Sequence, residues 1–371
     1  MMKIKQLGLL FGLIGAITGV QANDEKGNSR KKCHDEMQVQ DCKSLCFAGP
    51  HLQEDYCLEV MAAAIYEQVA VQASEVALFT SSTTQTGFPV GGVGLEPEET
   101  TSWGFKVGLG WKTGYDDWKF AARYTWLKAI TEAELVTATG GAYFPTGYVS
   151  PVLSSVTGTG TFPSFQSVLP GNYTLLSTLN IYLMRPTLYT ALLEVSPYFG
   201  IDFTTTRRRQ TVTFSNETPT PTTYTNGGYF RSYDNNSWWG VGPMAGFASN
   251  WYVGYDIGVY SDTYIALTYG QAKSYSQTLV NRLVSAGVFS TTDSTISNSV
   301  YQFSPELNFQ LGLSWMHALE DEKGAIGFKL GYETAYYFQV NKRLFNQPGY
   351  FLTTGSGIGT QGLVLQGQID F

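Results

Sequence analysis

The residues that could do redox or metal chemistry are few and lie near the start of the chain. Four cysteines are separated by eight, three and ten intervening residues: Cys33, Cys42, Cys46 and Cys57. His34 and His51 lie beside them, but no CxxC pair offers the spacing of zinc ligands. We therefore predict disulfides and no metal site. Three pairings, within or between chains, stay open.

Catalytic chemistry finds little support elsewhere in the chain. A serine hydrolase needs a histidine beside its serine, and the third histidine, His317, follows an expected strand in a short turn, where we expect it to be exposed. The stretch "GLGWKTG" (108–114) superficially resembles a phosphate-binding loop, but it leads into a strand instead of a helix. We predict that the protein is not an enzyme, with no catalytic residues and no cofactor.

Residues 1–22 predict a cleaved secretory signal. Lys3 and Lys5 precede the apolar run 7–17, and Val20-Gln21-Ala22 forms a small-residue cleavage site. The run is shorter than the about 20 residues of a membrane helix. Removal of this signal leaves 21 basic and 30 acidic side chains, a net charge of −9. That balance disfavours nucleic acid as a partner, since phosphate binding needs a basic surface.

The bulk composition is unusual for a water-soluble domain. Charged residues make up 14% of the chain and aromatic residues 15%, whereas soluble domains carry about 25% charged residues. A β-barrel with one lipid-facing and one polar surface averages to such a composition.

Strict alternation of apolar and polar residues is the main structural signal. In the stretch 325–340, Phe328, Leu330 and Tyr332 alternate with Lys329 and Gly331, so odd-numbered positions should face water. The same alternation places Val340 on the apolar face and Gln339 on the polar face. Five segments carry this pattern strongly: 103–111, 118–126, 306–315, 325–340 and 363–371.

Five weaker segments complete a set of ten strands: 61–73, 175–185, 191–206, 238–249 and 255–270. The first of them also fits an amphipathic helix. Strands of ten or more residues with aromatic ends suit a bilayer better than a soluble sandwich. We predict an all-β fold, a transmembrane up-and-down antiparallel β-barrel of about ten strands (eight to twelve). Its parts would be a signal (1–22), a cysteine segment (23–60) and the barrel (61–371).

The expected connections alternate in length. Short links should lie at 113–117, 186–190, 250–254 and 317–324, and long, Thr/Ser/Gly/Pro-rich loops at 74–102, 129–174, 207–237, 271–300 and 341–359. Short periplasmic turns and long extracellular loops are typical of outer-membrane barrels. We therefore expect the loops 129–174 and 207–237 outside the cell and the turn near Asp321 in the periplasm.

The chain ends in a two-faced strand, "GLVLQGQIDF". This strand must close the barrel, because an unpaired edge in lipid is forbidden. The terminal Phe371, preceded by alternating apolar residues, resembles the signal that barrel-assembly machinery reads.

The polar faces of the strands supply candidate pore-lining residues: Lys106, Lys119, Arg123, Glu194, Asp202, Glu306, Lys329, Glu333 and Asp370. Mixed signs would give a weakly selective pore, or ion pairs that bridge and block a narrow lumen. Inward glycines would leave room for water: Gly104, Gly108, Gly110, Gly240, Gly242, Gly246, Gly258, Gly327 and Gly331. The run Arg207-Arg208-Arg209 could bind lipopolysaccharide phosphates or attract anions at the surface, or form a solvated cluster.

Four stretches carry a family resemblance: "SWGFKVGLGWKTGYDDWKFAARYTWL", "LSTLNIYLMRPTLYTALLEVSPYFGIDF", "WGVGPMAGFASNWYVGYDIGVYSDTYIALTYG" and "FSPELNFQLGLSWMHAL". With the Arg185-Pro186 turn, they resemble the Legionella-type major outer membrane proteins from about Cys57 to Phe371. The resemblance implies a pore-forming barrel with passive diffusion through a water-filled lumen, and often disulfide-linked subunits.

The sequence thus predicts a porin of a Gram-negative outer membrane for small hydrophilic solutes or ions. The alternative is a closed structural or adhesive barrel that acts through long surface loops, and a secreted soluble β-sandwich is a third reading. Expected partners are outer-membrane lipid and lipopolysaccharide, barrel-assembly machinery, and a second copy of the chain through disulfides.

Overall fold

The computed structural model describes residues 57–72, 74–81, 92–97, 99–113, 118–131, 134–145, 165–188, 190, 192–215, 229–254, 256–285, 288–319, 324–347 and 350–371. The chain divides into two units, 1–47 and 48–371, and all described residues belong to the second. The predicted signal, most of the cysteine segment, Cys33, Cys42, Cys46, His34, His51 and Asp321 lie outside the described residues. Cys57 begins the first strand, but its side chain is not among the described ones.

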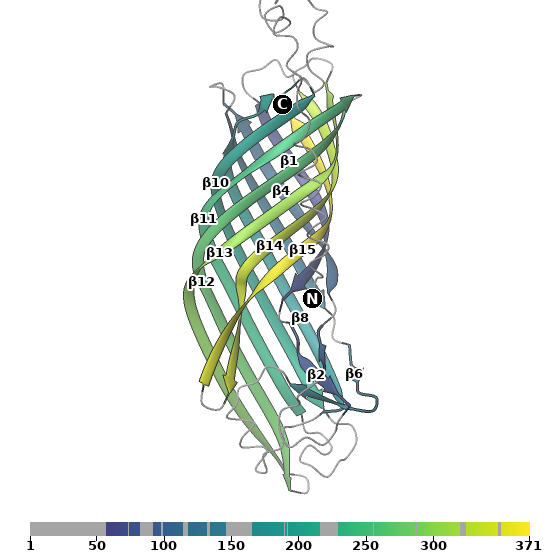
Figure 1. The fold of residues 1–371 in the computed structure, drawn as a ribbon, viewed down its shortest axis with the longest axis vertical. Coiled ribbons are helices and arrows are strands. Elements are labelled where there is room, and N and C mark those ends of the chain that lie inside the picture. Colours follow the sequence, from purple (N-terminus) through teal and green to yellow (C-terminus); the bar gives the residue numbers. More distant parts are fainter. Residues whose placement is uncertain are drawn as a thin grey trace, which may run out of the picture. The chain divides into compact units, whose positions relative to one another are not determined.

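Ten long strands form the barrel in the described part of the chain (Figure 1). They are β1 (Cys57–Val71), β4 (Thr100–Lys112), β5 (Lys119–Thr131), β8 (Ser167–Met184), β10 (Leu193–Ser215), β11 (Tyr229–Gly254), β12 (Ile257–Ser285), β13 (Val288–Ala318), β14 (Ala325–Gln347) and β15 (Tyr350–Asp370). Each strand pairs antiparallel with the next, and the ring is complete because β15 pairs with β1 and β8 with β10. The predicted ten-strand barrel is confirmed, and its first segment is a strand and not a helix.

Short strands lie at the ends of the barrel. β6 (Val136–Thr137) and β9 (Thr187–Leu188) extend the main sheet. β2 (Ala77–Thr80), β3 (Val93–Leu95) and β7 (Ala142–Pro145) form a separate three-stranded sheet within the connections that follow β1 and β5. These connections therefore contain structure of their own.

The last residues close the ring by their backbone. Glu59 pairs with Asp370, the Leu58 N–H donates to the Phe371 carbonyl at 2.7 Å, and the Phe371 N–H donates to the Leu58 carbonyl at 3.0 Å. This pairing leaves no open edge at the chain end, as a strand in lipid requires. The Phe371 side chain points outward and is 55% exposed.

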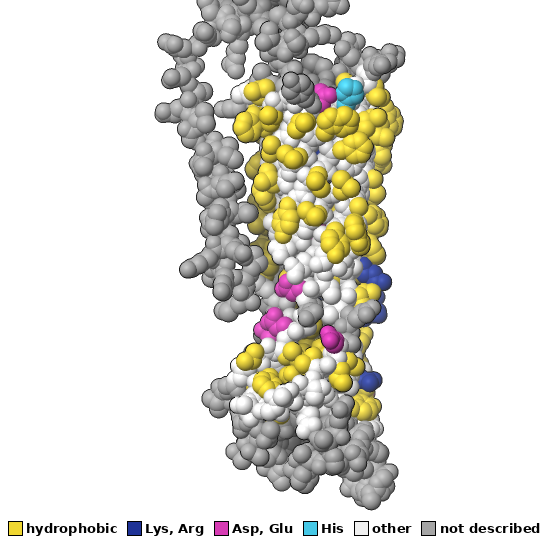
Figure 2. All heavy atoms as spheres, turned by 90° about the vertical axis from the view of Figure 1, so that its right-hand side faces the viewer, with side chains coloured by type: hydrophobic (Ala, Val, Ile, Leu, Met, Phe, Trp, Pro, Cys, Tyr) yellow, Lys and Arg dark blue, Asp and Glu magenta, His cyan; other side chains and the backbone are white. Residues whose placement is uncertain are grey.

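An apolar band covers the outside of the barrel at the end where β15 stops, which we call the short-turn end (Figure 2). Alternation produces it, because outward positions carry apolar side chains while inward neighbours are polar or small. On β14, Phe328, Leu330 and Tyr332 are about half exposed, whereas Gly331 and Glu333 are buried. The predicted orientation of this strand is confirmed over that stretch.

Among the described residues, no helix is long and apolar enough to cross a membrane.

Three of the long loops predicted from the sequence are largely strand. β10 and β11 are separated by residues 216–228 alone, β12 and β13 by 286–287, and β14 and β15 by 348–349. We call the parts of four strands beyond the apolar band the extension: 207–215, 229–238, 270–285 and 288–300. The prediction failed because outward positions there carry mostly Ser, Thr, Asn, Gln, Tyr and basic residues, which form no apolar stripe yet pair well in a sheet.

The prediction for Val340 and Gln339 is also wrong. The register between β14 and β15 shifts between Tyr337 and Asn341, and Gln339 has a positive φ of 56°. The bulge exchanges the two faces, so Val340 is 1% exposed and Gln339 points outward. Bulges of this kind re-aim side chains and cannot be seen in an alternation pattern.

Candidate functional site in the barrel lumen

The inner wall at the short-turn end carries the charged residues that sequence analysis selected. All nine predicted pore-lining residues lie at inward positions of their strands, and six of them are at most 8% exposed. These six are Lys106, Arg123, Asp202, Glu306, Glu333 and Asp370. Whether any of them contacts a solute remains a prediction.

Arg123 and Asp262 form an ion pair through the barrel interior. The Arg123 Nη1 lies 2.7 Å from the Asp262 Oδ2, and three strands separate β5 from β12 by the shorter way round the ring. The Tyr198 hydroxyl donates to the other Asp262 oxygen. The guanidinium also lies over the rings of Tyr182 and Tyr264, at 5.9 and 5.6 Å. Arg123 of β5 is therefore held by side chains of β8 and β12.

A second ion pair joins Lys106 of β4 to Glu333 of β14, which are not neighbours in the ring. Asn308 of β13 donates its side-chain amide to the other Glu333 oxygen at 2.6 Å. Both charged side chains are nearly inaccessible to solvent. Charges in such a place need partners, because an unpaired buried charge is strongly unfavourable.

Asp202 and Glu306 share a hydroxyl group deep in the lumen. The Thr204 Oγ1 lies 2.8 Å from Asp202 Oδ2 and 3.0 Å from Glu306 Oε2. Asn180 donates to Asp202, and the Thr268 hydroxyl lies 3.2 Å from Glu306 Oε1. These contacts link β8, β10, β12 and β13, and since each hydroxyl has a single proton, Thr204 donates to one of the two carboxyl groups at a time.

The remaining predicted residues lie nearer the short-turn end. Lys119 pairs with Glu59, which also accepts a bond from Gln368 at 2.9 Å. The same Gln368 amide donates to Asp370 at 3.1 Å. Lys329 lies over the Tyr260 ring at 5.6 Å, and Glu194 accepts a bond from the Tyr252 hydroxyl at 3.3 Å.

Sequence analysis missed Asp262 and Glu59, which neutralise two of the predicted cations. Asp262 could have been found, since it has the opposite parity to the apolar positions Val259 and Ile265. Glu59 was missed because the strand was expected to start at residue 61, whereas β1 begins at Cys57.

The room left by the inward glycines is filled by other side chains. A Cβ at Gly108 would lie 2.7 Å from Met61 Cε, one at Gly246 would lie 2.7 Å from the Tyr198 hydroxyl, and one at Gly331 would clash with the Tyr260 hydroxyl. The expectation that water occupies this volume is therefore wrong at these positions.

An apolar cluster lies in the lumen farther from the short-turn end, among buried polar side chains. Trp238 is 2% exposed and packs in a cluster with Ile65, Leu127, Leu176 and Ile358. These residues come from β11, β1, β5, β8 and β15, so the cluster spans the interior. A second cluster within the extension contains Phe214, Phe230 and Val280.

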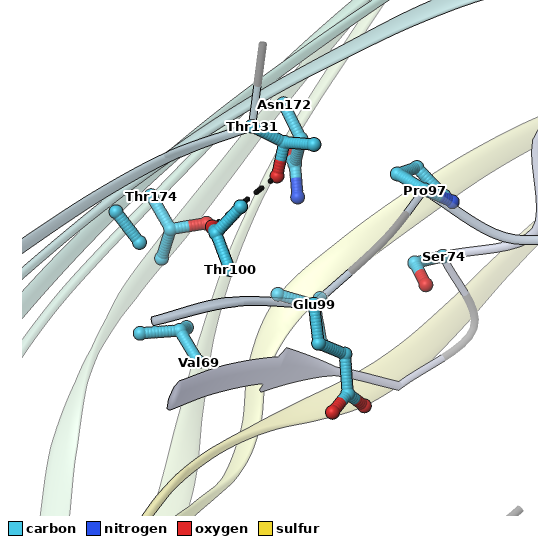
Figure 3. A pocket seen from close by; sticks show the side chains of 10 residues that line it. Val69, Ser74, Pro97, Glu99, Thr100, Thr131, Asn172 and Thr174 are labelled. Atoms are coloured by element: carbon cyan, nitrogen blue, oxygen red, sulfur yellow. Dashed lines mark hydrogen bonds between the residues drawn. The ribbon is translucent and has the colours of Figure 1, made fainter. Parts of the chain in front are cut away.

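A cavity of about 20 Å³ lies where β1, β4, β5 and β8 approach the loops (Figure 3). Figure 3 shows Glu99, Thr100, Thr131 and Asn172 around it, with a 3.4 Å contact between the two threonine hydroxyls. A space of this size holds about one water molecule, so it is not a ligand pocket.

The arginine run is split by the strand and does not open a loop. Arg207 and Arg209 are exposed on β10, whereas Arg208 points inward, is 2% exposed and donates to Asn172 at 3.3 Å. The prediction of a surface position is wrong for Arg208, because β10 continues through the run and alternates its side chains.

The structure also shows the position of His317, the third histidine of the chain. His317 is exposed and lies 2.7 Å from Asp256, with its ring stacked on Trp315. Within the described residues, no group of three or more His, Cys, Asp or Glu side chains is arranged to hold a metal ion. The absence of an enzymatic activity remains a prediction.

The fold and its apolar band define a membrane-spanning antiparallel β-barrel. A family profile described as the Legionella pneumophila major outer membrane protein precursor matches residues 51–371. The chain belongs to this family of outer-membrane barrels, and the resemblance found in the sequence is confirmed. Family and fold together support a location in the outer membrane.

Solved structures of outer-membrane barrels are similar in arrangement and distant in sequence. The outer membrane protease OmpT of Escherichia coli is 8% identical, with 85% of this chain and 96% of that chain covered and a TM-score of 0.36. A major outer membrane protein of Thermus thermophilus is 10% identical (86% and 100% covered, TM-score 0.29). The translocator domain of NalP from Neisseria meningitidis is 12% identical (91% and 96% covered, TM-score 0.28). None of the curated proteins compared with the chain matches it.

Proposed function

We propose that the protein is a closed outer-membrane barrel that acts through its extension, and that it is not a permanently open porin. The observation that carries this proposal is the ion pair between Arg123 and Asp262, which crosses the lumen. The pair narrows the lumen at this level, and separating it would leave a buried guanidinium without its carboxylate, which is strongly unfavourable.

Two further observations support a closed lumen. The second ion pair, Lys106 with Glu333, also bridges non-adjacent strands, and the apolar cluster around Trp238 lies farther along the same interior. A barrel of ten strands is only slightly wider than the eight-strand barrels that side chains fill completely. A barrel of this width is therefore narrow enough for side chains to fill its lumen.

The extension gives such a closed barrel a surface with which to act. Its outer wall is lined by polar cross-strand pairs, such as Gln271 with Ser299 at 2.8 Å and Gln277 with Asp293 at 2.9 Å. Polar walls held above a membrane suit contact with neighbouring or host surfaces, so the proposed role is structural or adhesive.

A diffusion porin is the second candidate, and one observation favours it. Within the apolar band, the lumen is lined by side chains of opposite charge and not by an apolar core. Where solvent enters, such ion pairs can exchange their partners for water or ions. Rearrangement of Lys119, Glu59 and Lys329, which are only partly buried, would then begin an opening at the short-turn end.

Conductance in a planar bilayer separates the two candidates. We expect refolded full-length protein to insert without steady conductance across the applied voltages. Asp262→Ala should increase conductance if it inserts, whereas Asp293→Ala, which removes an exposed carboxylate of the extension, should not. A steady, salt-dependent conductance of the unchanged protein would establish the porin and overturn the closed barrel.

A further inference from the structure

Four basic side chains occupy neighbouring outward positions where the apolar band ends. We call them the basic strip: Lys128, Arg207, Arg209 and Lys273. Lys128 of β5 and Arg207 of β10 both pair with Leu175 of β8. Arg207 also pairs with Ser237 of β11, which pairs with Lys273 of β12. Three of the four therefore lie in one row across five strands.

The spacing of the strip follows from the sheet. Neighbouring strands lie about 4.8 Å apart, so successive basic residues of the row have Cα atoms roughly 10 Å apart, and Arg209 lies about 7 Å farther along β10. The Tyr173 ring lies between them, with Lys128 Nζ 5.7 Å and Arg209 Cζ 5.9 Å from its centroid. This ring holds two of the cations on one face of the wall.

The strip lies where the extension begins, next to an outward row that contains aromatic side chains. The same register places Trp126, Trp239 and Tyr301 in the next outward row toward the short-turn end, where they alternate with Ser177, Thr205 and Gln271. Aromatic side chains of this kind mark the interface between hydrocarbon and head groups. The strip is thus at the level where a membrane presents its phosphate groups.

No carboxylate neutralises the strip in the described residues. The outward neighbours in its two rows are apolar, hydroxyl or amide side chains: Ile130, Tyr173, Leu175, Asn235, Ser237, Tyr275, Ser297 and Ser299. Arg207, Arg209 and Lys273 are exposed. Among the described residues, the positive charge of the strip is thus left available to an anionic ligand.

We propose that the basic strip binds the phosphate groups of lipopolysaccharide around the barrel. Arginine forks bind phosphate oxygens in pairs, and basic residues at an anionic lipid surface each contribute to binding. Acyl chains of the same molecule would lie on the apolar band next to Trp126 and Trp239, so an amphiphile fits this surface better than free phosphate. The proposal requires the outer-membrane location and is independent of whether the lumen conducts.

Binding of fluorescent lipopolysaccharide to refolded full-length protein in detergent tests this proposal. Arg207→Gln, Arg209→Gln and Lys273→Gln together should weaken binding about 100-fold, because each such residue contributes roughly fivefold. Arg207→Gln alone should weaken binding about fivefold. Arg231→Gln is its matched control: this exposed arginine pairs with Thr213, about 20 Å farther along the wall, and its loss should leave binding unchanged.

A second comparison needs no variant. Lipopolysaccharide stripped of its lipid phosphates should bind the unchanged protein far more weakly, and inorganic phosphate at the same phosphate concentration should not displace the labelled glycolipid. Equal affinity for the stripped and intact glycolipid, or equal effects of Arg207→Gln and Arg231→Gln, would refute the proposal. Displacement by inorganic phosphate would assign the strip to free phosphate instead.

Discussion

The membrane part of the barrel and the extension use one continuous sheet with opposite distributions of apolar side chains. On β10, Phe199 and Phe203 point outward within the apolar band, whereas Phe214, farther along the same strand, is 1% exposed and points inward. On β11, Trp239 points outward and Phe230 inward. The hydrophobic face thus changes sides where the surroundings change from lipid to water.

This difference shows that the alternation of apolar and polar residues depends on the surrounding medium, lipid or water, as well as on the strand itself. In the band, lipid accepts apolar side chains and the interior holds paired charges. In the extension, water faces the outer wall, and the inside combines the apolar cluster that contains Phe214, Phe230 and Val280 with buried polar side chains. These polar side chains are Arg208, Gln210, Ser232, Asp234, Asn236, Ser274, Ser276 and Thr278. The large aromatic side chains Phe214 and Phe230 of the extension are therefore buried inside the sheet and need no lipid to cover them.

The largest contrast should appear when one partner of an ion pair is removed. Asp262→Ala leaves Arg123 buried without its carboxylate and should destabilise the barrel by about 3–5 kcal/mol. Asp293→Ala, on the outer wall of the extension, should change stability by less than about 0.5 kcal/mol. Urea unfolding in lipid vesicles measures both. Similar values would contradict the view that charges in the band depend on their partners.

The second-largest difference between the apolar band and the extension should come from a charge placed on the outer wall. Leu330→Arg puts a cation in lipid and should cost about 2–4 kcal/mol near the bilayer centre. Ser297→Arg, an outward position of the extension, should fold as well as the unchanged chain. Folding yield into vesicles provides the readout. Lys329→Leu, the inward neighbour of Leu330, should be milder than Leu330→Arg, and equal yields would undermine the assigned faces.

Substitutions at two glycines of β14 test how tightly the lumen is packed within the apolar band. A Cβ at Gly331 would meet the Tyr260 hydroxyl and the Leu311 carbonyl, the latter at 2.8 Å, so Gly331→Ala should cost about 1–3 kcal/mol. At Gly327 the nearest atoms would lie 3.5 Å away, which is ordinary contact, and Gly327→Ala should be close to neutral. Thermal or urea unfolding compares the pair. A neutral Gly331→Ala would mean that the lumen there has room.

The smallest perturbation tests which region faces the cell exterior. Asp293→Cys and His317→Cys replace exposed side chains at opposite ends of the barrel and should leave stability unchanged. A membrane-impermeant maleimide applied to intact cells should label Asp293→Cys above the background of the native cysteines. It should not label His317→Cys. The reverse result would invert the proposed orientation.

Sequence patterns predicted the barrel class, its ten strands and the inward direction of the charged residues, because side-chain direction is a local property with period two. Lys106, Arg123 and Glu333 could be assigned to the inner face in this way. The extension escaped prediction because the apolar stripe changes face along β10 and β11, and a search for one lipid-facing stripe stops at the change. The bulge at Gln339 depends on a single backbone dihedral that no pattern encodes.

The tertiary structure alone decided which charges meet. Arg123 and Asp262 lie 139 residues apart in sequence, and their contact depends on the number of strands, the register of every intervening pair and the closure of β15 on β1. Each of these adds a displacement around the ring, so a shift in any one pair would bring a different residue opposite Arg123. Local sequence sets which face a side chain occupies, whereas the summed geometry of the closed sheet sets its partner and thereby whether the lumen is filled or open.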